Sequence, residues 1–101
     1  MRQFSVCRVK RPARGRLGQL VVILQHDQLQ DIRTRIVAPL LGLDASAPVD
    51  HLAPEVVFDG RRYRISFHKM ATLDTRDLEP VGRLEIQPLL MRAVDLIFAG
   101  I

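Results

Sequence analysis

Hydrophobic positions along most of the chain repeat with the period of extended strands. The run Leu20–Leu24 is continuously apolar and rich in β-branched residues, as in a strand that is buried on both faces. Phe4 and Val6 alternate with polar residues and predict a first strand. Residues 35–38 predict a further strand, at whose end Pro39 is expected to mark a sheet edge or a bulge.

The second half of the chain contains a hairpin signal at Asp59 and Gly60. An Asp-Gly pair between two strand-like runs is typical of a tight two-residue turn, because such a turn needs residues that tolerate positive φ angles. Within residues 61–67, apolar side chains alternate with basic or polar ones, which predicts one buried face and one solvated, basic face. A short extended piece around residues 71–73 then leads to residues 79–81.

Near the C-terminus the period changes to that of a helix. A single apolar stripe at helical spacing consists of Ile86, Leu89, Leu90, Ala93, Val94 and Ile97. Pro88 fits only a first turn, so the helix is expected to begin between Glu85 and Pro88. Gly100 with Ile101 then forms either an ordinary glycine cap or a placed contact point. Residues 1–101 therefore predict one α+β domain, an antiparallel sheet of five to seven strands with a C-terminal α-helix.

Composition narrows the class of protein without identifying it. Hydrophobic residues make up 48% of the chain, enough for a globular core, and no apolar run reaches the ~18 residues of a membrane span. The first residues do not resemble a signal peptide and Cys7 is the only cysteine, so a reducing cytoplasm is expected. No metal-ligand spacing is present, and neither a metal nor a cofactor is expected. The core of a 101-residue chain is modest, so a homodimer would help it.

The positive charge of the chain is concentrated near its start. The net charge is +4, from 15 basic and 11 acidic residues, and residues 2–16 contain six bases and no acid. Such a stretch can contact nucleic acid or an acidic protein segment, or it can form a solvated hairpin tip. The chain has no Trp and one Tyr, so a base-stacking platform for nucleic acid is not expected.

No group of residues points clearly to catalysis. The three histidines, His26, His51 and His68, lie in unrelated contexts, and no phosphate-binding loop or nucleophile motif is present. A metal-free ribonuclease site leaves almost no trace in a sequence, because it needs only one Arg with one Asp, Thr or His. An enzyme therefore stays open as a function but has no support from a motif.

Four segments give the chain a resemblance to the CcdB family of bacterial toxins. They are Gln3–Val6, Leu20–Gln25, Arg35–Leu40 and the ending Asp95–Ile101, and between them residues 54–60 and 69–71 follow in the family's order. Total length and the Phe-x-Gly-Ile ending are the most specific features of the match. The resemblance implies a small antiparallel barrel similar to a Src-homology-3 barrel, with a long C-terminal helix, in a two-fold homodimer.

The same resemblance implies a toxin of a type II toxin–antitoxin system that acts by binding rather than by catalysis. The family's toxin binds the A subunit of DNA gyrase and traps the enzyme while its DNA is cleaved, and a disordered CcdA-like antitoxin releases it. Toxin and antitoxin together repress their own operon, so operator DNA is contacted only through their complex. The gyrase contact of the family corresponds here to Ala99, Gly100 and Ile101. Ala99 stands where the well-studied toxin has a tryptophan, which is a strong type of interface anchor.

Contacts with the antitoxin are expected on basic surfaces, because a disordered acidic segment that folds on binding pairs with cations. The candidates are Arg11, Arg14 and Arg16 in the N-terminal loop and Arg62 and Arg64 on the later strand. Charge reversal at Arg14 and Arg16 is expected to weaken antitoxin binding more at low salt than at high salt.

Two other functions stay open at this point. MazF-like endoribonucleases share the barrel architecture, so the fold alone does not separate them from gyrase poisons. A ribonuclease site here would draw on Arg14 or Arg16 with Asp27 or Thr34. The other alternative is a toxin-like binding module that has lost its activity. Replacement of the tryptophan anchor by Ala99 is the kind of change expected in an inactive toxin. Two polar residues added after Ile101 should abolish gyrase poisoning and should leave a ribonuclease toxic.

Overall fold

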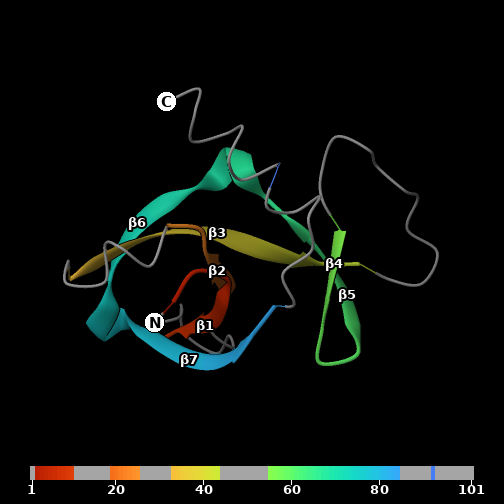
Figure 1. Cartoon of the computed structure of the whole chain (residues 1–101), viewed down its shortest axis with the longest axis horizontal. Coiled ribbons are helices and arrows are strands. Elements are labelled where there is room, and N and C mark those ends of the chain that lie inside the picture. Colours follow the sequence, from red (N-terminus) through yellow and green to blue (C-terminus); the bar gives the residue numbers. More distant parts are fainter. Residues whose placement is uncertain (1, 11–18, 26–32, 44–54, 85–91, 93–101) are drawn as a thin grey trace.

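The structure, a computed structural model, describes residues 2–10, 19–25, 33–43, 55–84 and 92. Over these ranges the chain forms a curled, seven-stranded antiparallel sheet (Figure 1). Its strands are β1 (Ser5–Val9), β2 (Leu20–Ile23), β3 (Thr34–Gly42), β4 (Glu55–Phe58), β5 (Arg61–Ile65), β6 (Ala71–Asp74) and β7 (Leu78–Arg83). Two 3-10 turns, η2 (Phe67–Lys69) and η3 (Thr75–Asp77), precede β6 and β7. The predicted antiparallel sheet is confirmed, whereas the predicted C-terminal helix lies outside the described residues, apart from Arg92.

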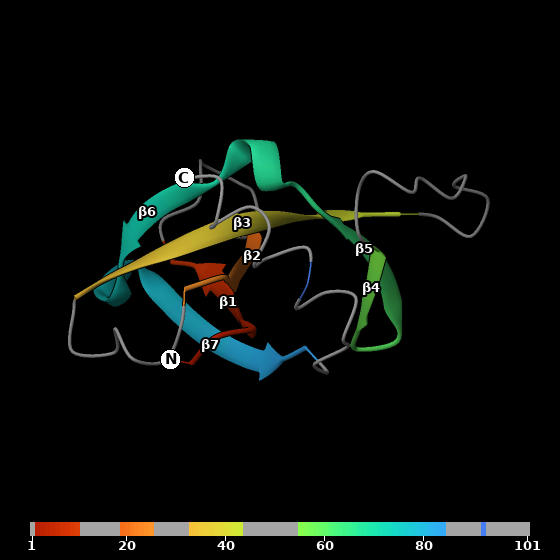
Figure 2. The same cartoon turned by 45° about the horizontal axis from the view of Figure 1, so that its top comes forward.

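The strand β3 is the centre of the sheet. The sheet follows the order β4-β5-β3-β2-β1-β7, and β6 is an additional partner of β3. On one side β3 pairs with β2, and on the other it pairs first with β6, over Thr34–Val37, and then with β5, over Leu40–Gly42. In Figure 2, β3 crosses the molecule with β6 towards one end and the β4–β5 hairpin at the other. The described residues therefore form a half-barrel from which the hairpin extends.

Pro39 lies within β3 and at neither an edge nor a bulge of that strand, which corrects the prediction. Its carbonyl accepts a hydrogen bond from the Ser66 N–H at 2.9 Å, so the Pro39 backbone faces the side of β5 and β6. Pairing with β6 ends at Val37 and pairing with β5 begins at Leu40. The pairing with β5 therefore ends at Pro39, which has no N–H to return to Ser66, and the Ser66 carbonyl accepts from the Lys69 N–H instead.

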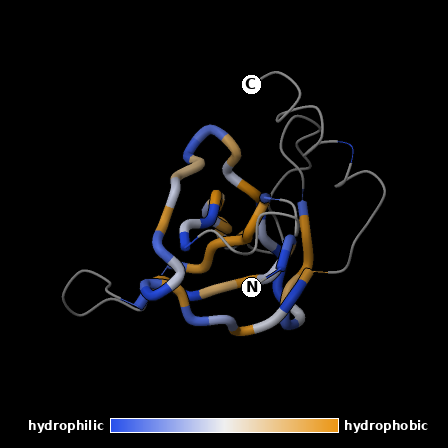
Figure 3. The backbone as a smooth tube through the Cα atoms, turned by 60° about the vertical axis from the view of Figure 1, so that its left-hand side comes forward, coloured by the Kyte–Doolittle hydropathy of each residue, from blue (hydrophilic) through white to orange (hydrophobic). Residues whose placement is uncertain are grey.

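Buried side chains form two clusters, and β2 contributes to both. Val22 belongs to the first cluster, whereas Val21 and Ile23 belong to the second. Because successive side chains point to opposite faces of a strand, β2 is buried on both faces, as predicted. The first cluster also contains Val56 and Ile65, which attach the hairpin to the core. Figure 3 shows hydrophobic and hydrophilic segments alternating along the strands.

Phe4 is predicted to lie in the first strand, but it precedes β1 and lies in a turn. Its φ angle is 65°, a left-handed value that favours glycine. The Phe4 N–H donates to the carbonyl of Ile23 at 2.7 Å, and the Phe4 carbonyl accepts from the Leu84 N–H at 2.9 Å. The side chain is fully buried. Burial and two backbone bonds therefore hold Phe4 in a conformation that an alternation pattern does not predict.

The predicted strand over residues 61–67 is shorter in the structure, where β5 ends at Ile65. Ser66, predicted on the solvated face, is instead 3% exposed, and it lies between the end of β5 and the start of η2, where its N–H donates to the Pro39 carbonyl. The extended pieces predicted around residues 71–73 and 79–81 correspond to β6 and β7. Among the residues described, no helix has the length and apolar character needed to span a membrane.

Candidate functional site

The hairpin β4–β5 positions the two site residues, Arg62 and Arg64, that lie within the described part of the chain. Its turn consists of Asp59, with a φ angle of 52°, and Gly60, with a φ angle of 76°. Positive φ angles at both central residues are those of a type I′ turn, whose twist matches that of two paired strands. The turn places Phe58 opposite Arg61 and so determines the register of the whole hairpin. The hairpin predicted from the Asp-Gly pair is confirmed.

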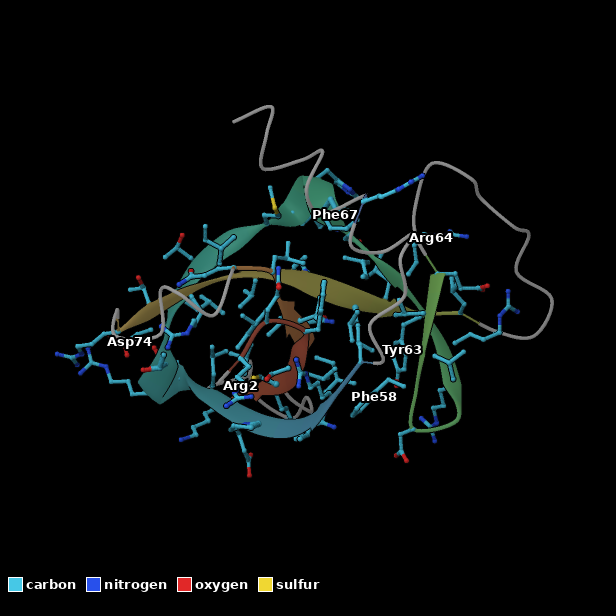
Figure 4. The ribbon with its side chains drawn as sticks, viewed as in Figure 1. Arg2, Phe58, Tyr63, Arg64, Phe67 and Asp74 are labelled. Carbon is cyan, nitrogen blue, oxygen red and sulfur yellow. The ribbon has the colours of Figure 1, made fainter. Side chains whose placement is uncertain are left out.

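This register places both arginines on one face of the hairpin. Arg64 is opposite Glu55 and Arg62 is opposite Val57, and side chains directly opposite each other share a face. The intervening residue Tyr63 points to the other face, where it packs against the first core cluster. Arg62 and Arg64 therefore point away from the core, as the alternation predicts, and both are half-buried (Figure 4).

Arg62 has an acidic partner within the hairpin. Its Nε donates to Glu55 Oε1 at 2.7 Å, and its Nη2 forms an ion pair with the same oxygen. The two side chains are 30% and 36% exposed, so water screens the pair, and such pairs contribute about 0–1 kcal/mol to stability. A binding partner with its own carboxylate can therefore compete with Glu55 for Arg62 at little cost.

Apolar side chains are exposed beside the arginines. Val57, opposite Arg62, is 63% exposed, and Leu41, opposite Arg64, is 39% exposed. We refer to Leu41, Glu55, Val57, Arg62 and Arg64 together as the hairpin face. Cations beside exposed aliphatic groups suit a protein segment that carries both acidic and apolar side chains. The hairpin face is therefore a candidate surface for such a segment.

The other predicted site residues lie largely outside the described residues. Those outside are Arg11, Arg14, Arg16, Ala99, Gly100 and Ile101, as well as Asp27 of the ribonuclease alternative. Thr34, the remaining residue of that alternative, begins β3, is exposed and lies opposite Asp74 of β6. His68 is exposed in η2. Among the described residues no group of three potential metal ligands occurs.

Two titratable groups in the described part have shifted pKa values. Burial raises the pKa of the Cys7 thiol, which lies in the second core cluster and is fully buried. The Asp74 carboxylate accepts a hydrogen bond from the Arg76 N–H at 3.0 Å, and this bond is the main reason why its pKa is lowered. Arg76 and Arg33 lower that pKa further through their charges. The raised pKa keeps Cys7 a neutral packing residue, and Asp74 caps η3.

The capping role of Asp74 is not predicted by the pattern of apolar residues. A signal for it existed, because Asp is among the preferred residues at the start of a helical turn. Asp74 lies at the end of β3 that is remote from Arg64 and the hairpin (Figure 4). In the described part of the chain it lies at the end of β6 and caps η3.

Comparison with known families agrees with the resemblance seen in the sequence. The model of one family, described as CcdB protein, matches residues 3–100 of the chain. No curated protein matches the chain. The match includes every described strand, so the half-barrel and the hairpin face both lie within the matched region.

Proposed function

The chain belongs to the CcdB protein family, and we propose that it is a toxin that binds the A subunit of DNA gyrase and traps the enzyme with cleaved DNA. The observation that carries the proposal is the family match across residues 3–100. The described geometry is consistent with a binding protein, because exposed apolar side chains lie beside basic ones on the hairpin face. The toxin acts in the cytoplasm, where its target is found.

Gyrase is contacted through the last three residues, Ala99, Gly100 and Ile101, by their correspondence to the family's contact. A two-fold homodimer presents this contact twice, which allows both copies of the gyrase protein to be engaged together. Alanine in place of the family's tryptophan removes a large aromatic anchor, so each contact is weaker than in the well-studied toxin. Gyrase poisoning therefore depends on the dimer and on Gly100 and Ile101.

The antitoxin covers the basic surfaces. Arg62 and Arg64 on the hairpin face supply two of its contacts, and Arg11, Arg14 and Arg16 supply the others. An acidic, disordered segment loses conformational freedom when it binds, and the exposed Val57 and Leu41 offer apolar contacts that offset part of that loss. The complex of toxin and CcdA-like antitoxin then represses the operon that encodes both.

The proposal is tested with purified protein in a gyrase assay. We expect the protein to inhibit supercoiling and to accumulate cleaved DNA when gyrase and ATP are present. A variant with two polar residues added after Ile101 should trap no cleaved DNA, while its folded state, checked by circular dichroism, stays unchanged. Cleavage of RNA by the protein without gyrase would support the ribonuclease alternative, and absence of both activities would support an inactive binding module.

A further inference from the structure

The strands β4 and β7 are the first and last in the order of the sheet, yet they lie on the two sides of one cleft. A cleft of about 660 Å³ lies between β4 and β7, with Val57 and Phe58 on one side and Val81 and Gly82 on the other. A methyl group at Gly82 would lie 2.5 Å from the ring of Phe58, so that ring rests directly on the Gly82 backbone. In Figure 4 the Phe58 side chain reaches from the hairpin towards β7. Close packing of Phe58 on Gly82 thus holds the two sides of the cleft together.

A β-bulge places one of the apolar side chains that line the cleft. Val6 of β1 is opposite Gly82, whereas the next residue, Cys7, is opposite Pro80. Val81 is therefore the extra residue of a bulge, a feature that redirects a side chain and often occurs beside binding sites. Val81 is 41% exposed, and Val57 across the cleft is 63% exposed.

The two strands that border the cleft differ in their capacity to accept another strand. The Leu43 N–H donates to the Arg62 carbonyl, so the backbone N–H and C=O of Arg62 point towards β3. Val57 lies opposite Arg62 on β4, and in such a pair the two backbones point away from each other. The backbone N–H and C=O of Val57 therefore point towards the outer edge of β4. No described strand covers that edge. On β7 one outward position is Pro80, which has no N–H to donate, so β7 is the less suitable of the two edges for strand addition.

Charge in the cleft favours an acidic occupant. Among the described residues that line it, Arg83, which is exposed, and Arg8 are basic, and Asp59 at the hairpin turn is the one acid. The chain as a whole carries a net charge of +4. An extended segment with alternating acidic and apolar side chains would meet cations and aliphatic groups on its two faces, because side chains alternate along a strand.

We propose that this cleft binds an extended acidic and apolar peptide segment, which adds as a strand to the outer edge of β4. Its backbone bonds to Val57, its apolar side chains contact Val57 and Val81, and its carboxylates lie near Arg83. The choice of the antitoxin as the source of that segment rests on the proposed function. The cleft shares Val57 with the hairpin face but is not lined by Arg62 or Arg64.

The test uses isotope-labelled protein and a blocked hexapeptide of alternating valine and glutamate, followed by NMR at low ionic strength. We expect shifts of backbone amides at residues 57–59 and 81–83. Arg83→Glu should weaken binding at least about threefold, a typical size for one exposed charge contact, and Arg76→Glu at the far end of the molecule should leave it unchanged. A peptide of alternating valine and lysine should not bind.

Val57→Pro tests the strand addition itself, because proline removes the outward N–H and is tolerated on an edge strand. It should abolish peptide binding, whereas Val57→Thr, which keeps the N–H and a branched side chain, should retain it. Wild-type affinity in a folded Val57→Pro variant, or amide shifts at Arg62 and Arg64 with none at residues 81–83, would overturn the proposal. If Val57→Pro does not fold, Arg83→Glu decides alone. The peptide measurements do not involve gyrase. A failure to trap cleaved DNA in the gyrase assay would therefore not change their outcome.

Discussion

The two ends of β3 both carry arginines paired with an acid, but they differ in the apolar side chains that surround these charges. At the β6 end, the Asp74 carboxylate lies 3.4 Å from Arg76 Nε and 3.8 Å from Arg33 Nη2. At the β5 end, Arg62 binds Glu55 on the hairpin face. Both ends thus have an acid that neutralises arginine charge, and the arginines at the β6 end are the more exposed, at 73% and 71% of their side chains.

Apolar exposure distinguishes the two ends. The large hydrophobic residues exposed in the described part of the chain are Leu41, Val57 and Val81, and they lie at the hairpin end or on β7, which faces it across the cleft. At the other end the carboxylate caps η3, so the charged groups there are engaged in a local turn. Exposed aliphatic groups beside the charges thus make the hairpin end the stronger candidate for a binding surface.

The largest effect is expected where the hairpin joins the core. Ile65 is 1% exposed in the first cluster, so Ile65→Ala should lower the free energy of unfolding by about 2–5 kcal/mol. Leu73→Ala, at the β6 end, should cost less, about 1–2 kcal/mol, because Leu73 is only half-buried. Urea unfolding of both variants measures the difference, and equal losses would show that the two ends are anchored alike.

A smaller effect is expected at the hairpin turn. Gly60 has a φ angle of 76° with open space around it, so Gly60→Ala should lower the free energy of unfolding by about 1–2 kcal/mol through backbone strain alone. Gly42→Ala is the matched control, because Gly42 also has open space and its φ angle is not in the left-handed region. The control should be neutral or slightly stabilising in the same urea experiment. A loss as large in Gly42→Ala would mean that strain is not the cause.

An effect of similar or smaller size is expected on antitoxin binding, which a charge change at the hairpin end should weaken and one at the β6 end should not. Arg64→Glu should weaken binding of the cognate antitoxin about fivefold, or about 1 kcal/mol, at low ionic strength and less at high ionic strength. Arg76→Glu changes the net charge equally and should leave the affinity unchanged. Calorimetric titration at two salt concentrations checks this pair. Equal weakening by both variants would indicate that net charge, and no particular surface, governs binding.

Short-range patterns predicted much of the fold because their physical causes are local. The Asp59-Gly60 turn needs only two residues that accept positive φ, and the apolar run of β2 identifies a strand buried on both faces. The predictions for Phe4 and Pro39 are wrong because both conformations depend on partners distant in the chain, Ile23 and Leu84 for Phe4 and Ser66 for Pro39.

The candidate site was predictable to a similar extent. Alternation along β5 places Arg62 and Arg64 on one face, and the two-residue turn implies their register against Glu55 and Val57. The cleft was not predictable, because it needs β4 and β7 to meet although they are the ends of the sheet order. The bulge that exposes Val81 is likewise a feature of the pairing of β1 with β7 and has no local signal.

The smallest effect is expected at the β6 end, from Asp74→Asn. The folded state lowers the pKa of Asp74, so this carboxylate contributes stability that is present above its unfolded pKa, about 3.9, and is lost as the pH falls through the folded pKa. Asparagine keeps an oxygen that can cap η3 but carries no charge. The wild type should therefore be slightly more stable than Asp74→Asn at pH 7, and the difference should vanish as the pH falls from about 5 to about 2. A difference that stays constant across this range would show that the cap geometry, and not the charge shared with Arg33 and Arg76, is what this end of β3 requires.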